Sequence, residues 1–214
     1  MIGKNKKVTF IRIPKNASTS LYNFFGPTNT IRDNVVPSEK EIHKDFFAPS
    51  HCRIIDAVEY LGDEILSLPT LSVVRNPYDR MVSMYFFAKK LNTSYKDILS
   101  KVYGRTADNF LDFCLLFQKM SEDEGFFSSW SQKSFIQIEN ETIGDVLRFE
   151  NLNEDFNKFL IKNNLLGFFD QYGKCLKKEN QTSHKMYKNY YCGDSKNIVE
   201  ELWSEDIEYF KYNF

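Results

Sequence analysis

Hydrophobic and polar positions near the start of the chain predict a strand, a tight turn and a helix in succession. Residues 8–13 (VTFIRI) form a compact β-type run that Pro14 ends. Residues 18–25 (STSLYNFF) then have helical character, and the dipeptide Gly26-Pro27 stops the helix. The chain therefore opens with two elements that are joined by a very short connection.

The same order returns in the middle of the chain. Residues 70–74 (TLSVV) are typical of a second strand, Asn76-Pro77 breaks that strand, and residues 78–90 predict a helix. Repeated strand–turn–helix units favour a parallel sheet with helices on its faces. We therefore expect an α/β fold with a central parallel sheet flanked by helices, in one domain over residues 1–214.

Apolar stripes predict the remaining elements, and we expect those stripes to form the core. Helices are expected over residues 53–61, 107–118, 152–160 and 198–210, and a short strand over residues 146–149. We expect irregular structure over residues 28–50, where Pro37 and Pro49 are breakers, and a long loop over the polar residues 121–140. Residues 173–197 are polar, basic and rich in tyrosine.

Composition and charge narrow the class of protein. The chain has 214 residues, of which 42% are hydrophobic, and this is enough for one domain with a real core. The formal net charge of −1 provides no global basic field that would attract nucleic acid or an anionic membrane. An anionic ligand therefore requires a local basic site.

Cysteine usage and hydropathy point to an intracellular setting. The four cysteines are widely scattered and include no close CxxC pair, which is typical of reduced thiols rather than a zinc knuckle. No apolar run approaches the length of a membrane span, and the basic N-terminus leads directly into the first strand, unlike a signal peptide. We expect a cytoplasmic protein without a membrane span.

The first candidate site is the turn between the first strand and its helix, which reads RIPKNASTS over residues 12–20. Backbone N–H groups at a helix N-terminus and the helix dipole favour an anion. Ala17 is small enough for close approach of a ligand, and Lys15 adds a mobile positive charge. Hydroxyl donors follow in Ser18, Thr19 and Ser20. The pattern predicts a P-loop-like phosphate or sulfate cradle without a Walker A sequence; the alternative is a capped helix with an exposed lysine.

The second candidate site is the segment VVRNPYDRMVS over residues 73–83. Arg75 follows a buried strand, which is the usual position of ligand-binding residues in open α/β sheets. Ser83 lies eight residues further on, in the predicted helix, so that both side chains are candidates to bind one phosphate group. The alternative is a surface arginine that pairs with Asp79.

These two segments, in this order and spacing, resemble the nucleotide-binding motifs of carbohydrate sulfotransferases. These enzymes use 3′-phosphoadenosine 5′-phosphosulfate (PAPS). The match is greatest to the heparan-sulfate 2-O-type and HNK-1/chondroitin-type branch and its bacterial relatives. IPKNASTSL resembles the family's 5′-phosphosulfate loop, and VVRNPYDRMVSMY resembles its 3′-phosphate motif. RFENLNEDF and the closing LWSEDIEYFKYNF resemble later parts of that family, so that residues 84–145 are the least covered.

The resemblance implies a role for individual residues. Lys15 would contact the sulfuryl-bearing bridge and stabilise charge on the departing phosphate. Arg12 matches an arginine before the loop, and Arg75 and Ser83 would bind the 3′-phosphate. The remaining residues that would contact the phosphosulfate or close over the nucleotide are Asn16, Ala17, Ser18, Thr19, Ser20, Ser183 and Lys185.

A histidine is the candidate base for the transfer. The chain has three, His43, His51 and His184, and His51 lies between the two binding motifs. A reference pKa of about 6.5 suits a histidine to proton abstraction near neutral pH. His51 also resembles the base of the 2-O branch, although Pro49 stands where that branch has a second histidine. His184 is the rival base, and a carboxylate such as Glu39 or Glu41 is a weaker one. A loop histidine without a catalytic role is the other alternative.

The resemblance and these residues together imply an in-line transfer of a sulfuryl group from PAPS to an acceptor hydroxyl, with 3′,5′-adenosine bisphosphate (PAP) as the second product. The resemblance implies a carbohydrate acceptor, while a peptide tyrosine, a lipid or a small alcohol stays open. We expect no metal ion. The alternatives are a nucleotide-dependent kinase, which would bind ATP and magnesium, and a non-catalytic nucleotide-binding protein of the same fold. The oligomeric state is not predicted.

Overall fold

The computed structural model describes residues 2–3, 7–25, 28–29, 51–90, 107–122, 126, 128–169, 176 and 185–214. The chain divides into two compact units. The first comprises Met1–Arg75 and Gln132–Asn180, and the second comprises Asn76–Ser131 and Gln181–Phe214. The expectation of one domain over the whole chain stays a prediction.

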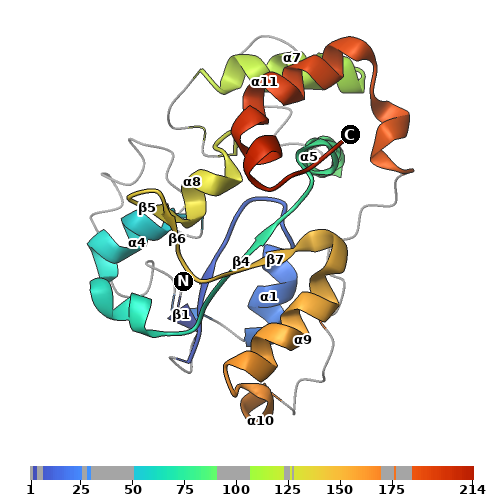
Figure 1. Cartoon of the computed structure of the whole chain (residues 1–214). Coiled ribbons are helices and arrows are strands. Elements are labelled where there is room, and N and C mark those ends of the chain that lie inside the picture. Colours follow the sequence, from blue (N-terminus) through green and yellow to red (C-terminus); the bar gives the residue numbers. More distant parts are fainter. Residues whose placement is uncertain are drawn as a thin grey trace. The chain divides into compact units, whose positions relative to one another are not determined.

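The first unit is built on a mixed sheet with strand order β3-β1-β2-β4-β7 (Figure 1). Its strands are β1 (Ile2–Gly3), β2 (Thr9–Ile11), β3 (Thr28–Asn29), β4 (Thr70–Val74) and β7 (Asp145–Arg148). Strands β2, β4 and β7 are parallel, which confirms the predicted parallel sheet. Strand β1 is antiparallel to both β2 and β3, an edge that the sequence patterns did not predict.

Strand register brings three connections to one edge of this sheet. Ile11 pairs with Ser72, and Val74 pairs with Arg148, so that the parallel strands end close together. The chain leaves these carboxyl ends through Arg12, Arg75 and Phe149. The carboxyl edge of parallel strands is the usual ligand-binding edge in α/β folds.

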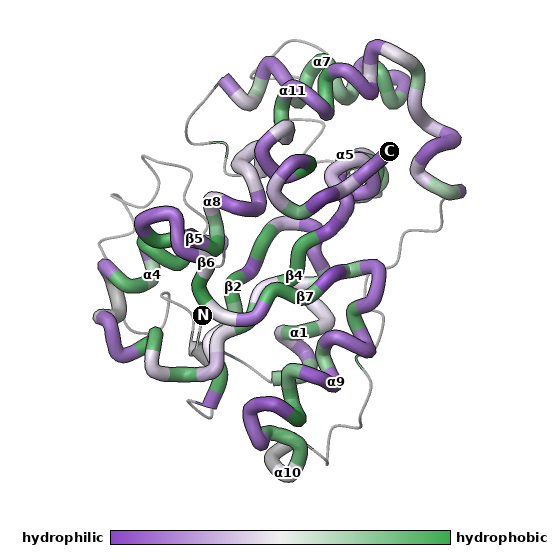
Figure 2. Tube along the Cα trace, viewed as in Figure 1, coloured by the Kyte–Doolittle hydropathy of each residue, from purple (hydrophilic) through white to green (hydrophobic). Residues whose placement is uncertain are grey.

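Helices α1 (Ser18–Phe25) and α9 (Leu152–Lys162) cover one face of the sheet (Figure 1). Alternate strand residues face them, because side chains of a strand point to opposite faces in turn. Phe24 of α1 meets Phe156 of α9 with ring centroids 4.8 Å apart in an edge-to-face arrangement. Figure 2 shows hydrophobic residues along β2 and β4, whereas α9 alternates between hydrophobic and hydrophilic positions, as expected for a helix on a core.

The other face carries the 3₁₀ helix η1 (Asp63–Ser67), where Ile65 accepts a hydrogen bond of 3.2 Å from the hydroxyl of Thr9. Helix α4 (Ile54–Leu61) precedes η1 and contacts α8 (Gln132–Ile136) and β5 (Gln137–Ile138). A two-stranded sheet of β5 and β6 (Glu141–Thr142) then leads to β7.

Gly144 sets the entry into β7. Its φ of +78° lies in the left-handed region, and a Cβ at this position would lie 2.4 Å from the carbonyl oxygen of Thr70. Only glycine allows this approach of the chain to the start of β4.

The second unit is helical. It contains α5 (Pro77–Lys90), α7 (Phe110–Met120), the 3₁₀ helix η4 (Tyr187–Tyr190) and α11 (Gly193–Tyr209), and α11 packs against α5 and α7. Asn76 caps α5, because its Oδ1 accepts from the backbone N–H of Tyr78 at 3.0 Å. Pro77 takes the first helical position, where a missing N–H does no harm. The Asn-Pro pair that ends the strand thus also starts the helix.

Two expectations were wrong in part. The predicted loop over residues 121–140 contains α8 and β5, because Phe135 and Ile136 are fully buried in what reads as a polar segment. The closing helix begins at Gly193 instead of residue 198, because Ser195 Oγ accepts from the N–H of Cys192 at 3.0 Å and caps an otherwise polar first turn. Most of the predicted irregular segment 28–50 lies outside the described residues.

Candidate active site

The turn between β2 and α1, residues 12–17, has an unusual backbone and is called the Lys15 turn below. Lys15 has a φ of 67° and Ala17 a φ of 56°. Two non-glycine residues, separated only by Asn16, thus adopt the left-handed conformation. Each costs about 1–2 kcal/mol relative to an ordinary conformation. The N–H of Leu21 bonds to the carbonyl of Ala17 at 3.2 Å, so that α1 starts directly after this turn. Successive N–H groups in such alternating conformations form a concave anion-binding arrangement.

The side chain of Asn16 ties this turn to the neighbouring strand. Asn16 is only 2% exposed, and its Nδ2 donates to the carbonyl of Val73 in β4 at 2.8 Å. The same nitrogen donates to Oε1 of Gln132 at 2.5 Å. Both amide protons of Asn16 are therefore used inside the protein, and its backbone N–H donates to the carbonyl of Ile13 at 3.3 Å, so that its predicted contact with a ligand stays a prediction.

Gln132, the first residue of α8, holds the backbone of Arg75. Its Oε1 accepts from the N–H of Arg75 at 2.8 Å, and its Nε2 donates to the carbonyl of Arg75 at 2.9 Å. Gln132 is fully buried. Sequence reasoning missed it because it lies in the segment predicted as a loop, and a single polar residue there carries no signal of burial.

The side chain of Arg75 joins the two predicted motifs. Its Nη1 donates to the carbonyl of Lys15 at 3.1 Å, and its guanidinium lies 4.0 Å from the ring centroid of Phe149. Arg75 is 7% exposed. The structure thus brings the side chain of Arg75 to the backbone of Lys15 and adds Phe149 as an unpredicted support.

His51 is anchored to the segment that precedes the turn. Its Nδ1 lies 2.9 Å from the carbonyl oxygen of Arg12. A carbonyl oxygen only accepts, so Nδ1 carries the proton in the neutral ring and Nε2 is the basic nitrogen. The half-buried His51 is therefore held by the backbone of Arg12, three residues before Lys15.

The other predicted site residues near this turn are Arg12 and the hydroxyl residues at the start of α1. The guanidinium of Arg12 lies 5.5 Å from the ring centroid of Tyr22, and burial lowers the pKa of Arg12 from its ordinary value. Ser18 and Thr19 are half-buried at the start of α1, whereas Ser20 is 6% exposed.

The other predicted nucleotide contacts lie elsewhere in the chain. Ser83 is 6% exposed on α5 of the second unit. Lys185 is exposed in the same unit, and its N–H donates to the hydroxyl of Tyr190 at 3.0 Å. Ser183 and the rival base His184 lie outside the described residues, as do His43, Glu39 and Glu41. The roles of Ser83, Ser183 and Lys185 stay predictions.

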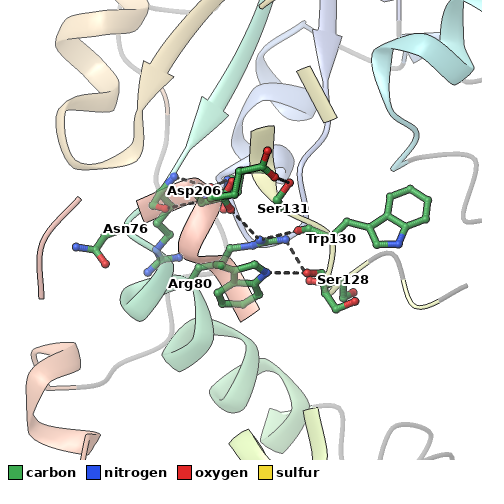
Figure 3. A network of polar contacts seen from close by, with 12 residues as sticks. Asn76, Arg80, Ser128, Trp130, Ser131 and Asp206 are labelled. Carbon is green, nitrogen blue, oxygen red and sulfur yellow. Dashed lines mark hydrogen bonds and ion pairs between the residues drawn. The ribbon is translucent and has the colours of Figure 1, made fainter. Parts of the chain in front are cut away.

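A buried polar network organises the second unit (Figure 3). Arg80 of α5 donates to the carbonyls of Trp130 at 3.2 Å and Ser128 at 3.1 Å, and its Nη1 lies 4.0 Å from Oδ2 of Asp206. Both charged side chains are fully buried. The guanidinium of Arg80 also lies 4.6 Å from the ring centroid of Trp203. This network fixes the segment just before Gln132 to helices α5 and α11.

Neither metal ligation nor membrane insertion is indicated in the described part of the chain. Within the described ranges, no group of three or more His, Cys, Asp or Glu side chains is arranged to hold a metal ion. The helices described there also include none with the length and hydropathy to cross a bilayer.

Comparison with known proteins identifies the family. A search of curated proteins found no match to this chain. The model of the sulfotransferase family matches residues 1–213, a range that includes the Lys15 turn, His51, Arg75 and the closing helix. A match of this extent indicates a transferase of sulfuryl groups and implies a sulfuryl donor. The chain belongs to the sulfotransferase family.

Proposed function

We propose that this protein transfers a sulfuryl group from PAPS to a hydroxyl group of a carbohydrate, with His51 as the base. The observation that carries the proposal is the hydrogen bond of 3.1 Å from Arg75 to the carbonyl of Lys15, which joins the two predicted nucleotide-binding motifs. A left-handed turn at Lys15 and Ala17, directly before α1, supports an anionic ligand at the same place.

The donor fits the chemistry of these residues. The turn and the N-terminus of α1 supply N–H groups for the 5′-phosphosulfate, and Ser18, Thr19 and Ser20 supply hydroxyls. Lys15 supplies a positive charge for the phosphate oxygen that departs from sulfur. Arg75 supplies a second positive charge, and we assign the 3′-phosphate to it together with Ser83.

In the proposed reaction, Nε2 of His51 takes the proton of the acceptor hydroxyl while the hydroxyl oxygen bonds to sulfur. The bond between sulfur and the bridging phosphate oxygen breaks on the opposite side. Lys15 and the N-terminus of α1 stabilise the negative charge that PAP gains. The products are a sulfate ester and PAP, and the proton stays on His51 until solvent removes it.

Calorimetric titration of the whole chain with PAP tests the donor. We expect PAP to bind more tightly than ATP with magnesium, and Lys15→Ala to weaken PAP binding at least tenfold. Gln118→Ala, which removes an exposed hydrogen bond to Glu201 on the second unit, is the matched control and should bind PAP as the parent does. Preferential binding of ATP with magnesium would replace the proposal with the kinase alternative.

Transfer of radioactive sulfate from labelled PAPS tests the acceptor. The arms are desulfated uronic-acid polysaccharides, a tyrosine peptide and a small alcohol. We expect label in the polysaccharide arm. Label only in the peptide or alcohol arm would overturn the carbohydrate assignment, and PAP binding without transfer to any acceptor would support the non-catalytic alternative.

A further inference from the structure

Gln132 takes the place of a neighbouring strand at the end of β4. The ladder between β4 and β7 ends at the pair Val74 and Arg148. At the next residue, Arg75, the side-chain amide of Gln132 satisfies both backbone groups, with hydrogen bonds of 2.8 and 2.9 Å. One side chain therefore holds the backbone conformation from which the Arg75 guanidinium projects.

The same amide reaches the Lys15 turn. Oε1 of Gln132 accepts from Arg75 and from Nδ2 of Asn16, and Asn16 also donates to the carbonyl of Val73. Gln132 is fully buried and Asn16 nearly so. Because water has little access, lost hydrogen bonds here are not replaced by solvent.

We infer that Gln132 is a positioning residue that holds Lys15 and Arg75 in one fixed arrangement, and that this arrangement sets the affinity for the nucleotide. The inference rests on the proposed function for the identity of that nucleotide. We call the hydrogen-bonded residues Asn16, Gln132 and Arg75 the Asn16–Gln132–Arg75 clamp. The hydrogen bond from Arg75 to the carbonyl of Lys15 connects this clamp back to the residue before Asn16, so that its members are positioned together. A merely structural residue would change stability without a separate effect on affinity.

An isosteric substitution isolates the hydrogen bonds. Gln132→Met keeps the side-chain volume but removes the partners of the Arg75 N–H, the Arg75 carbonyl and one Asn16 amide proton. Phe135→Leu, on the same helix, disturbs the buried core without removing a hydrogen bond and serves as the stability-matched control. Gln137→Met is the second control, because Gln137 donates to the exposed carbonyl of Asn140 at 3.3 Å.

PAP affinity is measured by calorimetry beside the melting temperature of each variant. We expect both Gln132→Met and Phe135→Leu to lower the melting temperature by similar amounts. Gln132→Met should also weaken PAP binding at least tenfold, whereas Phe135→Leu should bind PAP as the parent does. Loss of affinity in proportion to the loss of melting temperature in both variants would overturn the inference. If Gln132→Met does not fold, Gln132→Glu keeps both acceptor contacts but places its second carboxyl oxygen against the Arg75 carbonyl. We then expect a loss of at least about threefold in affinity at a pH at which this carboxyl is ionised.

Hydrogen exchange of the Arg75 amide proton, measured by NMR without nucleotide, separates this inference from the proposed function. We expect faster exchange in Gln132→Met than in Phe135→Leu. If the parent fails to bind PAP but this difference in exchange is found, the proposed function is wrong and the clamp stands. Equal exchange in the two variants would refute the clamp.

Discussion

The imidazole of His51 donates its Nδ1 proton to the carbonyl of Arg12 at 2.9 Å, three residues before Lys15. This contact decides which ring nitrogen is basic and fixes the ring to the strand end from which the anion-binding turn departs. The proposed base and the proposed charge-stabilising lysine are thus supported by the same short backbone segment.

His51→Gln should lower the turnover rate by about 10²- to 10⁴-fold, because no other group then accepts the proton of the acceptor hydroxyl. PAP affinity should stay within about twofold of the parent, since the proposed base does not bind the nucleotide. Rates of sulfate transfer and calorimetric PAP binding are the two measurements. His184→Gln is the control, and a loss of rate in that variant alone would transfer the base role to His184.

Ala17 offers a test of the left-handed turn. Ala17→Gly removes the side chain at a φ of 56° and should leave PAP affinity within about threefold. Ala17→Val places a β-branched side chain in the same conformation and should lower the free energy of unfolding by about 2 kcal/mol. Urea denaturation and PAP titration measure the two effects. Equal stability of the two variants would show that residue 17 does not hold a left-handed conformation.

Asn16→Asp should destabilise the protein in a pH-dependent way. The new carboxylate would lie against two acceptors, the carbonyl of Val73 and Oε1 of Gln132, in a buried position. Burial raises the pKa of such a group in the folded state, so that stability is retained at low pH and falls as pH rises through that pKa. Urea denaturation should therefore show a larger loss at pH 8 than at pH 5. Asn16→Ala should show a loss that does not depend on pH.

We predict a large coupling free energy between the buried side chains of Arg80 and Asp206. Arg80→Met and Asp206→Asn should each lower the free energy of unfolding by about 3–5 kcal/mol, because each leaves one buried group without its partner. The double variant should lose at least about 1 kcal/mol less than the sum. Arg53→Met removes the partly exposed pair with Asp56 and should cost about 1 kcal/mol or less. Additive losses at Arg80 and Asp206 would contradict the coupling.

Thiol labelling should distinguish the described cysteines. The hydroxyl of Ser195 lowers the pKa of the exposed Cys192, whereas burial raises the pKa of Cys114 to about 12 and also raises that of Cys52. In a Cys175→Ser background, iodoacetamide at pH 7.5 should therefore modify Cys192 first, because its thiolate fraction is largest. Ser195→Ala should slow that reaction. Mass spectrometry of the labelled peptides locates the modification.

The sequence predicted the turns and elements around the candidate site that depend on local patterns. A β-type run followed by a helix start located the Lys15 turn, and the Asn-Pro pair after a buried run located Arg75. Gln132 was missed because its burial depends on hydrogen bonds to residues distant in the chain, and no local periodicity reports such contacts. The left-handed backbone at Lys15 and Ala17 was also missed, since neither residue type favours that conformation. Strand β1 pairs through only a few residues, too few for a pattern to predict.

The Asn16–Gln132–Arg75 clamp also has a consequence for the order of folding. Its hydrogen bonds join residues that are 57 and 116 positions apart, so that the chain must close long loops before they form. Contacts of this separation form late relative to local helices, because the entropy of loop closure must first be overcome. A chain that has formed α1 and α5 but has not yet docked α8 would therefore have helices without a nucleotide site. Binding competence would appear in the last kinetic phase of refolding.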